Sequence, residues 1–226
     1  MPIKNQKNWY DSYYSHVSRY SRLNNFGNYI HLLQMGFFVH VPEEAVIIDV
    51  GCGDGNVLRT LHEKGYDNLH GFDIKLPPDF MEAENRGLHL KQGDMLEMPY
   101  PDDFTDVIIC FDSMHHLLSY EAYDLFLKNC RRVLKEGGKL FIFEPRDNFL
   151  CRIKNIIIKI PFVSDLPYIK YHKIYTNEEK DEIELFFNAD LRGFLTSSGF
   201  EIVYHKNLPR RVIVFCRNKH KKQQVK

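Results

Sequence analysis

Short runs of branched apolar residues recur through the middle of this chain, and polar bends and segments with helical spacing separate them. Five runs predict buried strands: Val46–Ile48, Leu69–Ile74, Leu88–Met95 (with the turn that follows the strand), Asp106–Phe111 and Gly138–Pro145. Apolar strands that alternate with helices are typical of a parallel sheet with both faces covered. The pattern therefore predicts an α/β fold.

The two ends of the chain carry other patterns. Aromatic and apolar residues at rough helical spacing predict two helices within residues 8–40. Ahead of the fifth strand, Arg132–Lys139 predicts a helix that glycines close. Towards the end, the pattern predicts a helix over Phe187–Ser197 and two strands, Phe200–Tyr204 and Arg211–Cys216. The last residues, 219–226, predict a short, basic, solvated tail.

The first strand leads into a glycine-rich bend. Gly51, Gly53 and Gly55 allow the main chain to turn tightly with no side chain in the way of a ligand. With the helix predicted from Asn56 onward, the bend forms a pocket for a nucleotide-like cofactor. A dinucleotide fingerprint needs glycine at the position of Asn56, and the Gly-Lys-Ser/Thr of a phosphate-binding loop is absent. A nicotinamide-dependent oxidoreductase stays an alternative.

The bend resembles motif I of the class I (Rossmann-like) S-adenosylmethionine-dependent methyltransferases, of the small-molecule type. The run Asp49-Val-Gly-Cys-Gly-Asp-Gly55 matches that motif position by position, and the elements predicted over residues 43–147 follow the family's order. The resemblance implies a doubly wound, mostly parallel seven-stranded sheet of order 3-2-1-4-5-7-6, with the last strand antiparallel. It also implies helices on both faces and an N-terminal helical cap.

The same resemblance implies how S-adenosylmethionine, and its product S-adenosylhomocysteine, are held. Asp73, which ends the second strand, binds both ribose hydroxyls. Asp94 accepts from the adenine amino group, and the backbone amide of Met95 meets a ring nitrogen. Tyr13, Tyr14 or Tyr20 in the N-terminal cap offers a hydroxyl to the methionine end, or packs on the core instead. The residues expected at the cofactor are Asp49, Gly51, Cys52, Gly53, Gly55, Asp73, Ile74, Asp94, Met95, Phe111 and His116, with Tyr14 and Tyr20.

Methyl transfer from a sulfonium is an in-line displacement, so the alignment of the reacting groups supplies much of the catalysis. A base is needed only when the acceptor must lose a proton. The candidates follow the fourth strand: His115 or His116, whose imidazole titrates near neutrality, with Asp112 and Glu144 as further candidates. The alternative is structural, because in relatives a histidine at the His116 position packs against the cofactor or caps the next helix.

Composition and charge describe an ordinary globular chain of 226 residues, with 44% hydrophobic and 27% charged residues. Lys+Arg and Asp+Glu are both 30, so no overall field attracts nucleic acid or an anionic membrane. Five scattered cysteines lack metal-ligand spacing, and Cys52, Cys110 and Cys130 fall on predicted core elements. We therefore expect no metal, reduced thiols and a cytoplasmic location, without a signal peptide or a membrane-spanning segment.

We expect a single methyltransferase domain over residues 1–226. Its parts are the cap at 1–42, the cofactor-binding core at 43–147, a lid or substrate insertion at 148–185, the C-terminal helix and hairpin at 186–218 and the tail at 219–226. Within the insertion, residues 150–163 mix apolar residues with cations. They predict either a lid helix over the substrate pocket or an amphipathic element that makes weak peripheral contact with a membrane or a lipid-like acceptor.

The sequence after the fourth strand limits the class of molecule that can be the methyl acceptor. Phe-Asp-Ser-Met at 111–114 replaces the Asn/Asp-Pro-Pro-Tyr/Phe of enzymes that methylate exocyclic amines, and cytosine-carbon methylation would need a cysteine beside a proline there. The core also has no contiguous Lys/Arg patch of the kind that RNA requires. A small-molecule acceptor, methylated on O, N or C, is therefore favoured over nucleic acid. An RNA methyltransferase and a catalytically silent cofactor-binding subunit that activates a partner stay alternatives, and the oligomeric state is open.

Overall fold

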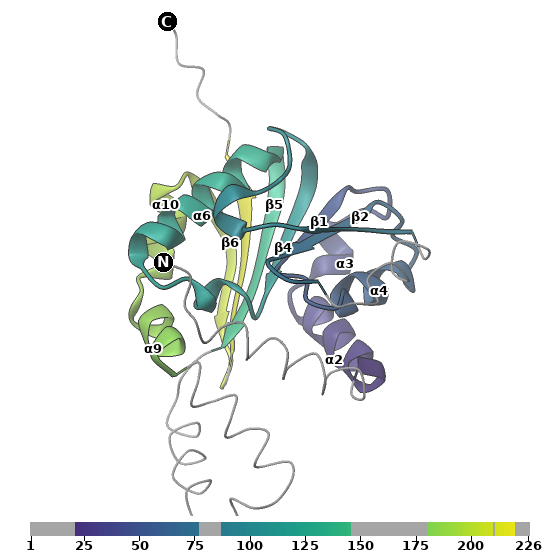
Figure 1. The fold of residues 1–226 in the computed structure, drawn as a ribbon, viewed down its shortest axis with the longest axis horizontal. Helices are drawn as coiled ribbons and strands as arrows, with labels where there is room; N and C mark the ends of the chain where they lie inside the picture. Colours follow the sequence, from purple (N-terminus) through teal and green to yellow (C-terminus); the bar gives the residue numbers. More distant parts are fainter. Residues whose placement is uncertain (1–20, 77–86, 146–179, 210, 220–226) are drawn as a thin grey trace, which may run out of the picture.

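The computed structural model describes residues 21–76, 87–145, 180–209 and 211–219. Its centre is a twisted seven-stranded sheet between two layers of helices (Figure 1). The strands are β1 (Ile47–Val50), β2 (Leu69–Asp73), β3 (Leu88–Gln92), β4 (Thr105–Phe111), β5 (Leu134–Pro145), β6 (Phe200–Asn207) and β7 (Arg211–Asn218). The helices are α2 (Ser21–Gln34), α3 (Phe37–His40), α4 (Asn56–His62), α6 (Tyr120–Val133), α9 (Lys180–Asn188) and α10 (Leu191–Ser197), with the 3-10 turns η1 (Met95–Glu97) and η2 (Met114–His116).

The order of strands across the sheet is β3-β2-β1-β4-β5-β7-β6. β1 to β5 are parallel to one another, whereas β7 runs antiparallel to both β5 and β6. These findings confirm the predicted doubly wound sheet with its antiparallel last strand. The order reverses between β1 and β4, and in open α/β sheets ligands bind at the carboxyl ends of the strands beside such a reversal.

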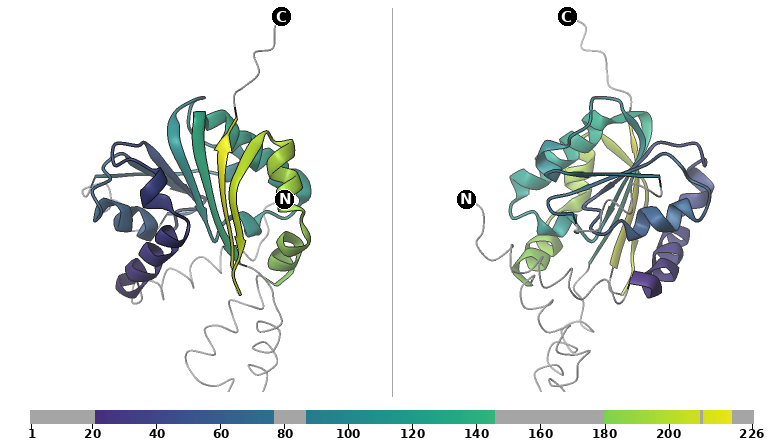
Figure 2. Two further views of the ribbon diagram at one scale, coloured as in Figure 1. Left: turned by 180° about the vertical axis from the view of Figure 1, so that it is seen from behind. Right: turned by 45° about the vertical axis from the view of Figure 1, so that its right-hand side comes forward.

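The helices cover both faces of the sheet, as predicted. α2, α3 and α4 lie on one face, and α6, α9 and α10 lie on the other, which both views in Figure 2 show. Successive side chains of β4 point to opposite faces of the sheet and pack against both layers of helices. Val107 and Ile109 pack towards α4, and Ile108 and Cys110 pack towards α6. All four are fully buried, and each branched side chain buried in this way contributes about 1.5–3 kcal/mol.

The cysteines expected in the core are buried there. Cys52, Cys110 and Cys130 have free thiols, and so does Cys216. Burial raises the pKa of each thiol, so all four are protonated at neutral pH. Within the described ranges no group of three or more His, Cys, Asp or Glu side chains is arranged to hold a metal ion. No helix of those ranges is long and apolar enough to cross a bilayer.

The junction between α6 and β5 differs from the prediction. β5 begins at Leu134, so Gly137 and Gly138 lie inside the strand and do not close the helix. The pairing of β5 with β4 shifts register in this part of the strand. Gly137 has a φ of 74°, and a Cβ on Gly138 would lie 2.8 Å from the backbone oxygen of Lys135. The two glycines therefore serve an irregularity within the strand: Gly137 supplies the positive φ, and Gly138 stands where a side chain has no room.

The predicted helix over Phe187–Ser197 is also wrong, because two helices occupy this part of the chain. α9 begins earlier, at Lys180, and α10 follows after a break. In the break, the Asp190 carboxylate accepts a hydrogen bond of 2.9 Å from the Gly193 backbone N–H and caps the new helix. The two strands that follow, β6 and β7, form the predicted antiparallel hairpin and are longer than predicted.

The N-terminal segment holds helices as expected, as far as the structure describes it. α2 and α3 are separated at Gly36, whose φ of 69° is accessible to glycine at little cost. Phe37 of α3 is fully buried and packs on Phe141 of β5, with ring centroids 5.0 Å apart. Residues 8–20 of this segment lie outside the described residues.

His70 on β2 makes the stability of the folded chain sensitive to acid. Its ring stacks on His89 of β3, with centroids 4.9 Å apart, and meets Phe104 edge to face at 5.2 Å. Burial lowers the pKa of His70 to about 4, with further lowering by the charges of His89 and Lys91. On acidification the unfolded chain therefore takes up a proton at this position before the folded chain does.

We predict that the free energy of unfolding falls as the pH drops from about 6.5, where an unfolded histidine titrates, towards the folded value near 4. The stabilisation is fully present above this window and is lost within it. In the His70→Phe variant the decline over the same window should be shallower, because no proton is taken up here. Urea denaturation of both proteins at pH values across the window measures the difference, and parallel curves would contradict the prediction.

Candidate functional site

The glycine bend after β1 forms a stretch of bare main chain at the carboxyl edge of the sheet. Gly51, Gly53 and Gly55 have φ values of 70°, 54° and 76°, a region that favours glycine. A Cβ on Gly51 would lie 2.5 Å from Cβ of Ser113, so this position must stay bare for the loops to pack. Within the part of the chain that the structure describes, a Cβ on Gly53 would meet nothing within 4 Å. These residues therefore leave the surface over Gly53 open to a ligand.

Asp73 at the end of β2 lies against this bend. One carboxylate oxygen accepts a hydrogen bond of 2.9 Å from the backbone N–H of Gly53, and the other accepts one of 3.1 Å from the backbone N–H of Lys75. Only 8% of the residue is exposed. These contacts hold the carboxylate beside the open surface over the bend, where the sequence predicts the ribose site.

Three carboxylates gather around the bend: Asp49 in β1, Asp54 in the loop and Asp73. Burial raises the pKa of Asp49 well above its usual range, and the charges of Asp73 and Asp54 raise it further. Burial likewise raises the pKa of Asp54 and of Asp73. Carboxylates that repel one another in a buried site become more stable when a cation arrives. The cradle therefore suits a ligand that brings positive charge.

The other predicted cofactor residues surround the bend in different ways. Met95 is half-buried, and its Cε lies 3.9 Å from the point where a Cβ on Gly51 would stand. Ile74 is 48% exposed and can offer an apolar surface. Asp94 is exposed and caps η1, since its carboxylate accepts a hydrogen bond of 2.8 Å from the Leu96 N–H. Asp94 thus has a structural role in addition to the predicted adenine contact.

The Cys52 side chain packs beneath the bend. Its Cβ and Sγ lie 3.0 Å from the point where a Cβ on Gly71 would stand, and only 7% of the residue is exposed. Glycine at position 71 therefore makes room for the thiol under the loop. Tyr13, Tyr14 and Tyr20 lie outside the described residues, as does the predicted lid over 150–163.

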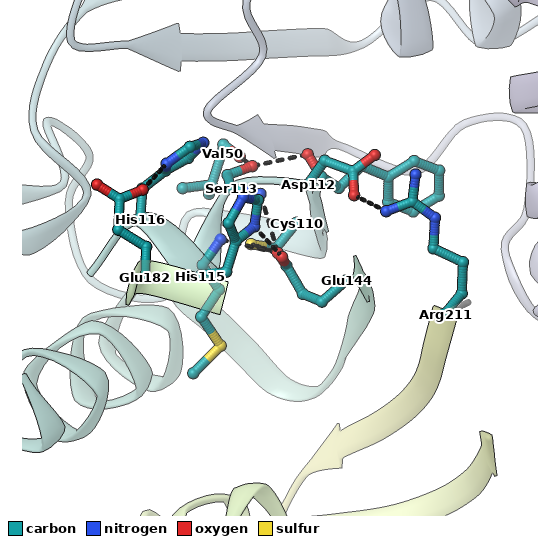
Figure 3. A network of polar contacts seen from close by, with 11 residues as sticks. Val50, Cys110, Asp112, Ser113, His115, His116, Glu144, Glu182 and Arg211 are labelled. Atoms are coloured by element: carbon teal, nitrogen blue, oxygen red, sulfur yellow. Dashed lines mark hydrogen bonds and ion pairs between the residues drawn. The ribbon is translucent and has the colours of Figure 1, made fainter. Parts of the chain in front are cut away.

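The turn after β4 is built around the Glu144 carboxylate at the end of β5, as Figure 3 shows. Its Oε1 accepts hydrogen bonds from the backbone N–H groups of Ser113 at 2.9 Å and Met114 at 2.7 Å, and the Cys110 thiol lies 3.5 Å away. Its Oε2 lies 2.7 Å from Nδ1 of His115. Burial raises the pKa of Glu144, but the hydrogen bond and charge of His115 and the two N–H groups outweigh it and hold the pKa below the usual range. Glu144 is therefore ionised and fully buried.

Ser113 connects this turn to the glycine bend. Its hydroxyl lies 2.9 Å from the carbonyl oxygen of Val50 and 2.8 Å from that of Phe111, and it donates its hydrogen to one of them at a time. Because Val50 directly precedes Gly51, the hydroxyl links the end of β1 to the end of β4. Sequence reasoning missed Ser113, since a single serine after a strand carries no distinctive signal.

The structure separates the two candidate histidines. His115 is 1% exposed and faces the buried Glu144 carboxylate. His116 has a side chain that is 25% exposed, and its Nδ1 lies 2.7 Å from Oε2 of Glu182 in α9. The charge of His116 is also among the influences that lower the pKa of Asp73, although the larger effect of burial raises it. Sequence reasoning did not find Glu182, which falls in the predicted insertion.

A second polar pair lies at the same edge of the sheet, beyond β4. Asp112 has a φ of 51°, which is uncommon for a residue with a side chain, and its carboxylate pairs with Arg211 at the start of β7. The Arg211 guanidinium lies 5.2 Å from the centre of the Phe143 ring, which also packs on Phe111. Phe111, predicted beside the cofactor, is half-buried, whereas Phe143 is buried. Asp112 is engaged by Arg211, another residue that the sequence did not single out.

A sheet of this order, with a glycine bend after β1 and an acid at the end of β2, defines the Rossmann-like methyltransferase class. A family model described as a methyltransferase domain matches residues 48–142. A protein of Encephalitozoon cuniculi that is named as a methyltransferase is 27% identical over 166 residues, 74% of this chain and 75% of its own length. A sterol 24-C-methyltransferase of Gibberella zeae is 31% identical over 106 residues, 43% of this chain and 27% of its own length.

Among solved structures, a chain in the complex between the Haloferax volcanii Trm112 methyltransferase activator and a methyltransferase has a TM-score of 0.63 at 13% identity, over 93% of this chain and 98% of that one. This likeness extends the shared fold beyond the matched core. The core of this chain at residues 48–142 is thus similar to a methyltransferase domain, and its sheet has the fold of the class I methyltransferases, whose cofactor is S-adenosylmethionine. The described residues fit that cofactor, because the acidic cradle around the bare bend suits a sulfonium and an ammonium group.

Two glycine substitutions should separate folding from cofactor binding. In Gly53→Ala the added methyl group points into open space, so we predict a loss of stability of about 1–2 kcal/mol from the positive φ alone and a loss of cofactor affinity of at least about tenfold from blocked access. In Gly51→Ala the methyl group meets Ser113, so a larger loss of stability is expected. Chemical denaturation and calorimetric titration with S-adenosylhomocysteine measure both quantities. Normal binding by Gly53→Ala would contradict a cofactor site over this bend.

Proposed function

We propose that this protein transfers the methyl group of S-adenosylmethionine to a small-molecule acceptor. The observation that carries the proposal is the juxtaposition of Asp73 with the open main chain at Gly53. A carboxylate beside bare backbone at a strand end is suited to the ribose hydroxyls of an adenosine group. The bound cofactor supplies a methyl carbon that a nucleophilic atom attacks in line.

The residues around the bend have separate proposed roles in binding. Asp73 accepts hydrogen bonds from the ribose while it keeps its own contact with the loop. Asp94 and Met95 lie on the adenine side, next to the exposed Ile74. Asp49 lies under the bend, and a bound cationic group stabilises the ionised form of its carboxyl, which burial and the charges of Asp73 and Asp54 disfavour. Together these residues fix the cofactor in one orientation, which is the main protein contribution to an in-line transfer.

The acceptor is expected over the ends of β4 and β5, on the far side of Ser113 from the cofactor cradle. Phe111 is half-buried there and packs on the buried Phe143, with ring centroids 5.2 Å apart. The pair of Asp112 and Arg211 adds polar groups that are about one-third exposed. A partly exposed aromatic ring beside a few polar groups is typical of small-molecule pockets, and this supports a small acceptor.

The ion pairs among the described residues also favour a small acceptor over RNA. Basic side chains that pair with carboxylates in the described residues are Arg59, Lys128, Arg132, Lys135, Arg211 and Arg217. Paired cations give a weak field for a phosphate backbone. Relatives that match only the core are named for tRNA and rRNA methylation as well as for a fatty acid, so RNA stays the alternative acceptor.

Transfer of labelled methyl groups separates these alternatives. The protein is incubated with labelled S-adenosylmethionine and either total RNA or an extract of small metabolites and lipids. We predict label in the small-molecule fraction. Label in RNA would overturn the choice of acceptor, and cofactor binding without transfer to either would support the silent subunit that activates a partner.

The segment at 150–163 and the location of the protein in the cell are the subjects of two further predictions. Residues 150–163, predicted as a lid helix or an element that contacts a membrane, lie outside the described residues. Co-sedimentation with anionic vesicles at low salt tests the membrane contact, and its absence would leave the lid. The cytoplasmic location rests on the cysteine pattern, with which the buried free thiols agree.

Replacement of Asp73 tests the cofactor site itself. We predict that Asp73→Ala weakens the binding of S-adenosylhomocysteine by about 1–3 kcal/mol, because hydrogen bonds to a charged acceptor are lost, while the protein stays folded. Asp73→Asn is the matched control, since it keeps the shape and one acceptor oxygen and should lose less. Calorimetric titration of the three proteins measures the affinities. Equal affinities would mean that the ribose lies elsewhere.

A further inference from the structure

We propose that Asp49 carries a proton before the cofactor binds and releases it to solvent when a cationic group of the cofactor reaches the acidic bend. This inference rests on the proposed function and concerns how its cofactor site selects a ligand. Through this exchange Asp49 favours compounds that combine adenosine with a positive charge. The observation behind it is a buried carboxyl without a hydrogen-bond donor, next to two carboxylates that have donors.

The surroundings of Asp49 in the sheet do not stabilise a negative charge. The residue lies in β1, two positions before Gly51, and only 2% of it is exposed. Its neighbours across the sheet are uncharged, because it lies opposite Gly71 of β2 and Ile109 of β4. Among the described residues no group donates a hydrogen bond to its carboxyl, on which burial and other carboxylates act. A carboxyl buried in this way takes up a proton rather than keep its charge.

The two other carboxylates of the bend differ from Asp49 because each has donors. Asp73 accepts hydrogen bonds of 2.9 and 3.1 Å from two backbone N–H groups. Asp54 accepts one of 2.7 Å from the side-chain amide of Asn56 and pairs with Arg59 at 3.4 Å. Burial raises the pKa of both carboxyls, but these contacts lower it and offset part of the cost of ionisation. Of the three, Asp49 therefore depends most on a charge that a ligand brings.

The charges that act on Asp49 from the neighbouring elements are negative. Asp73 at the end of β2 and Asp54 in the bend both raise its pKa beyond the effect of burial. The Cys52 thiol below the bend is protonated, because burial raises its pKa and the charge of Asp49 adds to that effect. The guanidinium of Arg59, which approaches from α4, is engaged by Asp54.

The histidines on the other elements around the bend do not supply the buried acid with a cation either. His31 of α2 is neutral at pH 7, because burial lowers its pKa. In the turn after β4, His115 lies 2.7 Å from Glu144, and His116 lies 2.7 Å from Glu182. Any positive charge on these two rings is thus balanced by its own carboxylate. Within the described part of the chain, the cation that Asp49 needs is left for a ligand to bring.

The cofactor carries such a cation. S-adenosylmethionine has a sulfonium and an ammonium group, and S-adenosylhomocysteine keeps the ammonium. A cation bound over the bare main chain at Gly53 lies among the three carboxylates, where its attraction is stronger than in water. It stabilises the ionised form of Asp49, so the O–H proton leaves to solvent and the carboxylate stays as a counter-ion. An adenosine compound without a cation leaves Asp49 protonated.

Calorimetry in buffers of different ionisation enthalpy measures the protons that ligand binding releases. The full chain is titrated with S-adenosylhomocysteine and with methylthioadenosine, which keeps the adenosine and the sulfur but has no ammonium. We predict a release of up to about one proton with S-adenosylhomocysteine and none with methylthioadenosine. In Asp49→Asn, which cannot ionise, the release should disappear. Asp102→Asn, at an exposed carboxylate before β4, is the control and should release as the wild type does.

The same exchange gives the affinity a defined dependence on pH. Because the unbound protein holds more protons than the complex, the affinity for S-adenosylhomocysteine should rise with pH, by up to about tenfold per pH unit. The affinity for methylthioadenosine should stay level, and Asp49→Asn should flatten the rise. A structural role for Asp49 would not produce this difference between two ligands of one protein.

Infrared difference spectra of the wild-type chain observe the proton directly and do not require the variant to fold. The carbonyl band of a protonated carboxyl should disappear when S-adenosylhomocysteine is added and persist with methylthioadenosine. Equal proton release with both ligands, or an unchanged release in a folded Asp49→Asn protein, would overturn the inference. If the wild-type chain does not bind S-adenosylhomocysteine, the proposed function fails. If it binds the compound without releasing a proton, only the inference about Asp49 fails.

Discussion

A single buried carboxylate, that of Glu144, holds together the part of the fold on which the site depends. An ionised group without exposure is costly by several kcal/mol unless hydrogen bonds replace the lost water. Here two backbone N–H groups and the His115 ring do so at 2.7–2.9 Å. These donors all belong to the turn after β4, so the carboxylate fixes the conformation of that turn. Through Ser113 the same turn is joined to the end of β1, where the glycine bend begins.

This constraint divides the carboxyl edge of the sheet into two sides. On one side, β1 and β2 present the bare main chain at Gly53 together with the Asp73 carboxylate. On the other, β4 and β7 present the half-buried Phe111 and the pair formed by Asp112 and Arg211, and Phe111 packs on the buried Phe143 of β5. Ser113, in the turn after β4, links the two sides through the carbonyl oxygen of Val50. The reversal of strand order between β1 and β4 is what brings a cofactor side and an acceptor side next to each other.

The fold was largely predictable from the sequence because its signals are local. Apolar runs such as Ile47–Val50 and Val107–Cys110 predict buried strands. The spacing of Gly51, Gly53 and Gly55 distinguishes this bend from a dinucleotide-binding loop. The errors occurred at junctions. Gly137 and Gly138 resemble a helix terminator but serve a strand irregularity, and the Asp190 cap divides a segment whose pattern suits one helix.

The site was predictable only in part, because its polar contacts are long-range. Glu144 and His115 are 29 positions apart, His116 and Glu182 are 66 apart, and Arg211 and Asp112 are 99 apart. The periodicity of apolar residues in the sequence does not indicate pairs that are so far apart along the chain. One signal was available for Glu144: an acid that ends the apolar strand Leu140–Phe143 must be buried with partners. Asp73 was found because its place after β2 follows from the family pattern.

The measurement that most directly tests the role of Glu144 is the affinity of the Glu144→Gln variant for S-adenosylhomocysteine, by isothermal titration calorimetry. The amide is nearly the same size, but it replaces an acceptor with a donor that faces the Nδ1–H of His115. If the carboxylate sets the turn that completes the site, affinity falls by at least about tenfold, although Glu144 itself is buried beneath the turn. Wild-type affinity in a folded Glu144→Gln protein would contradict this account.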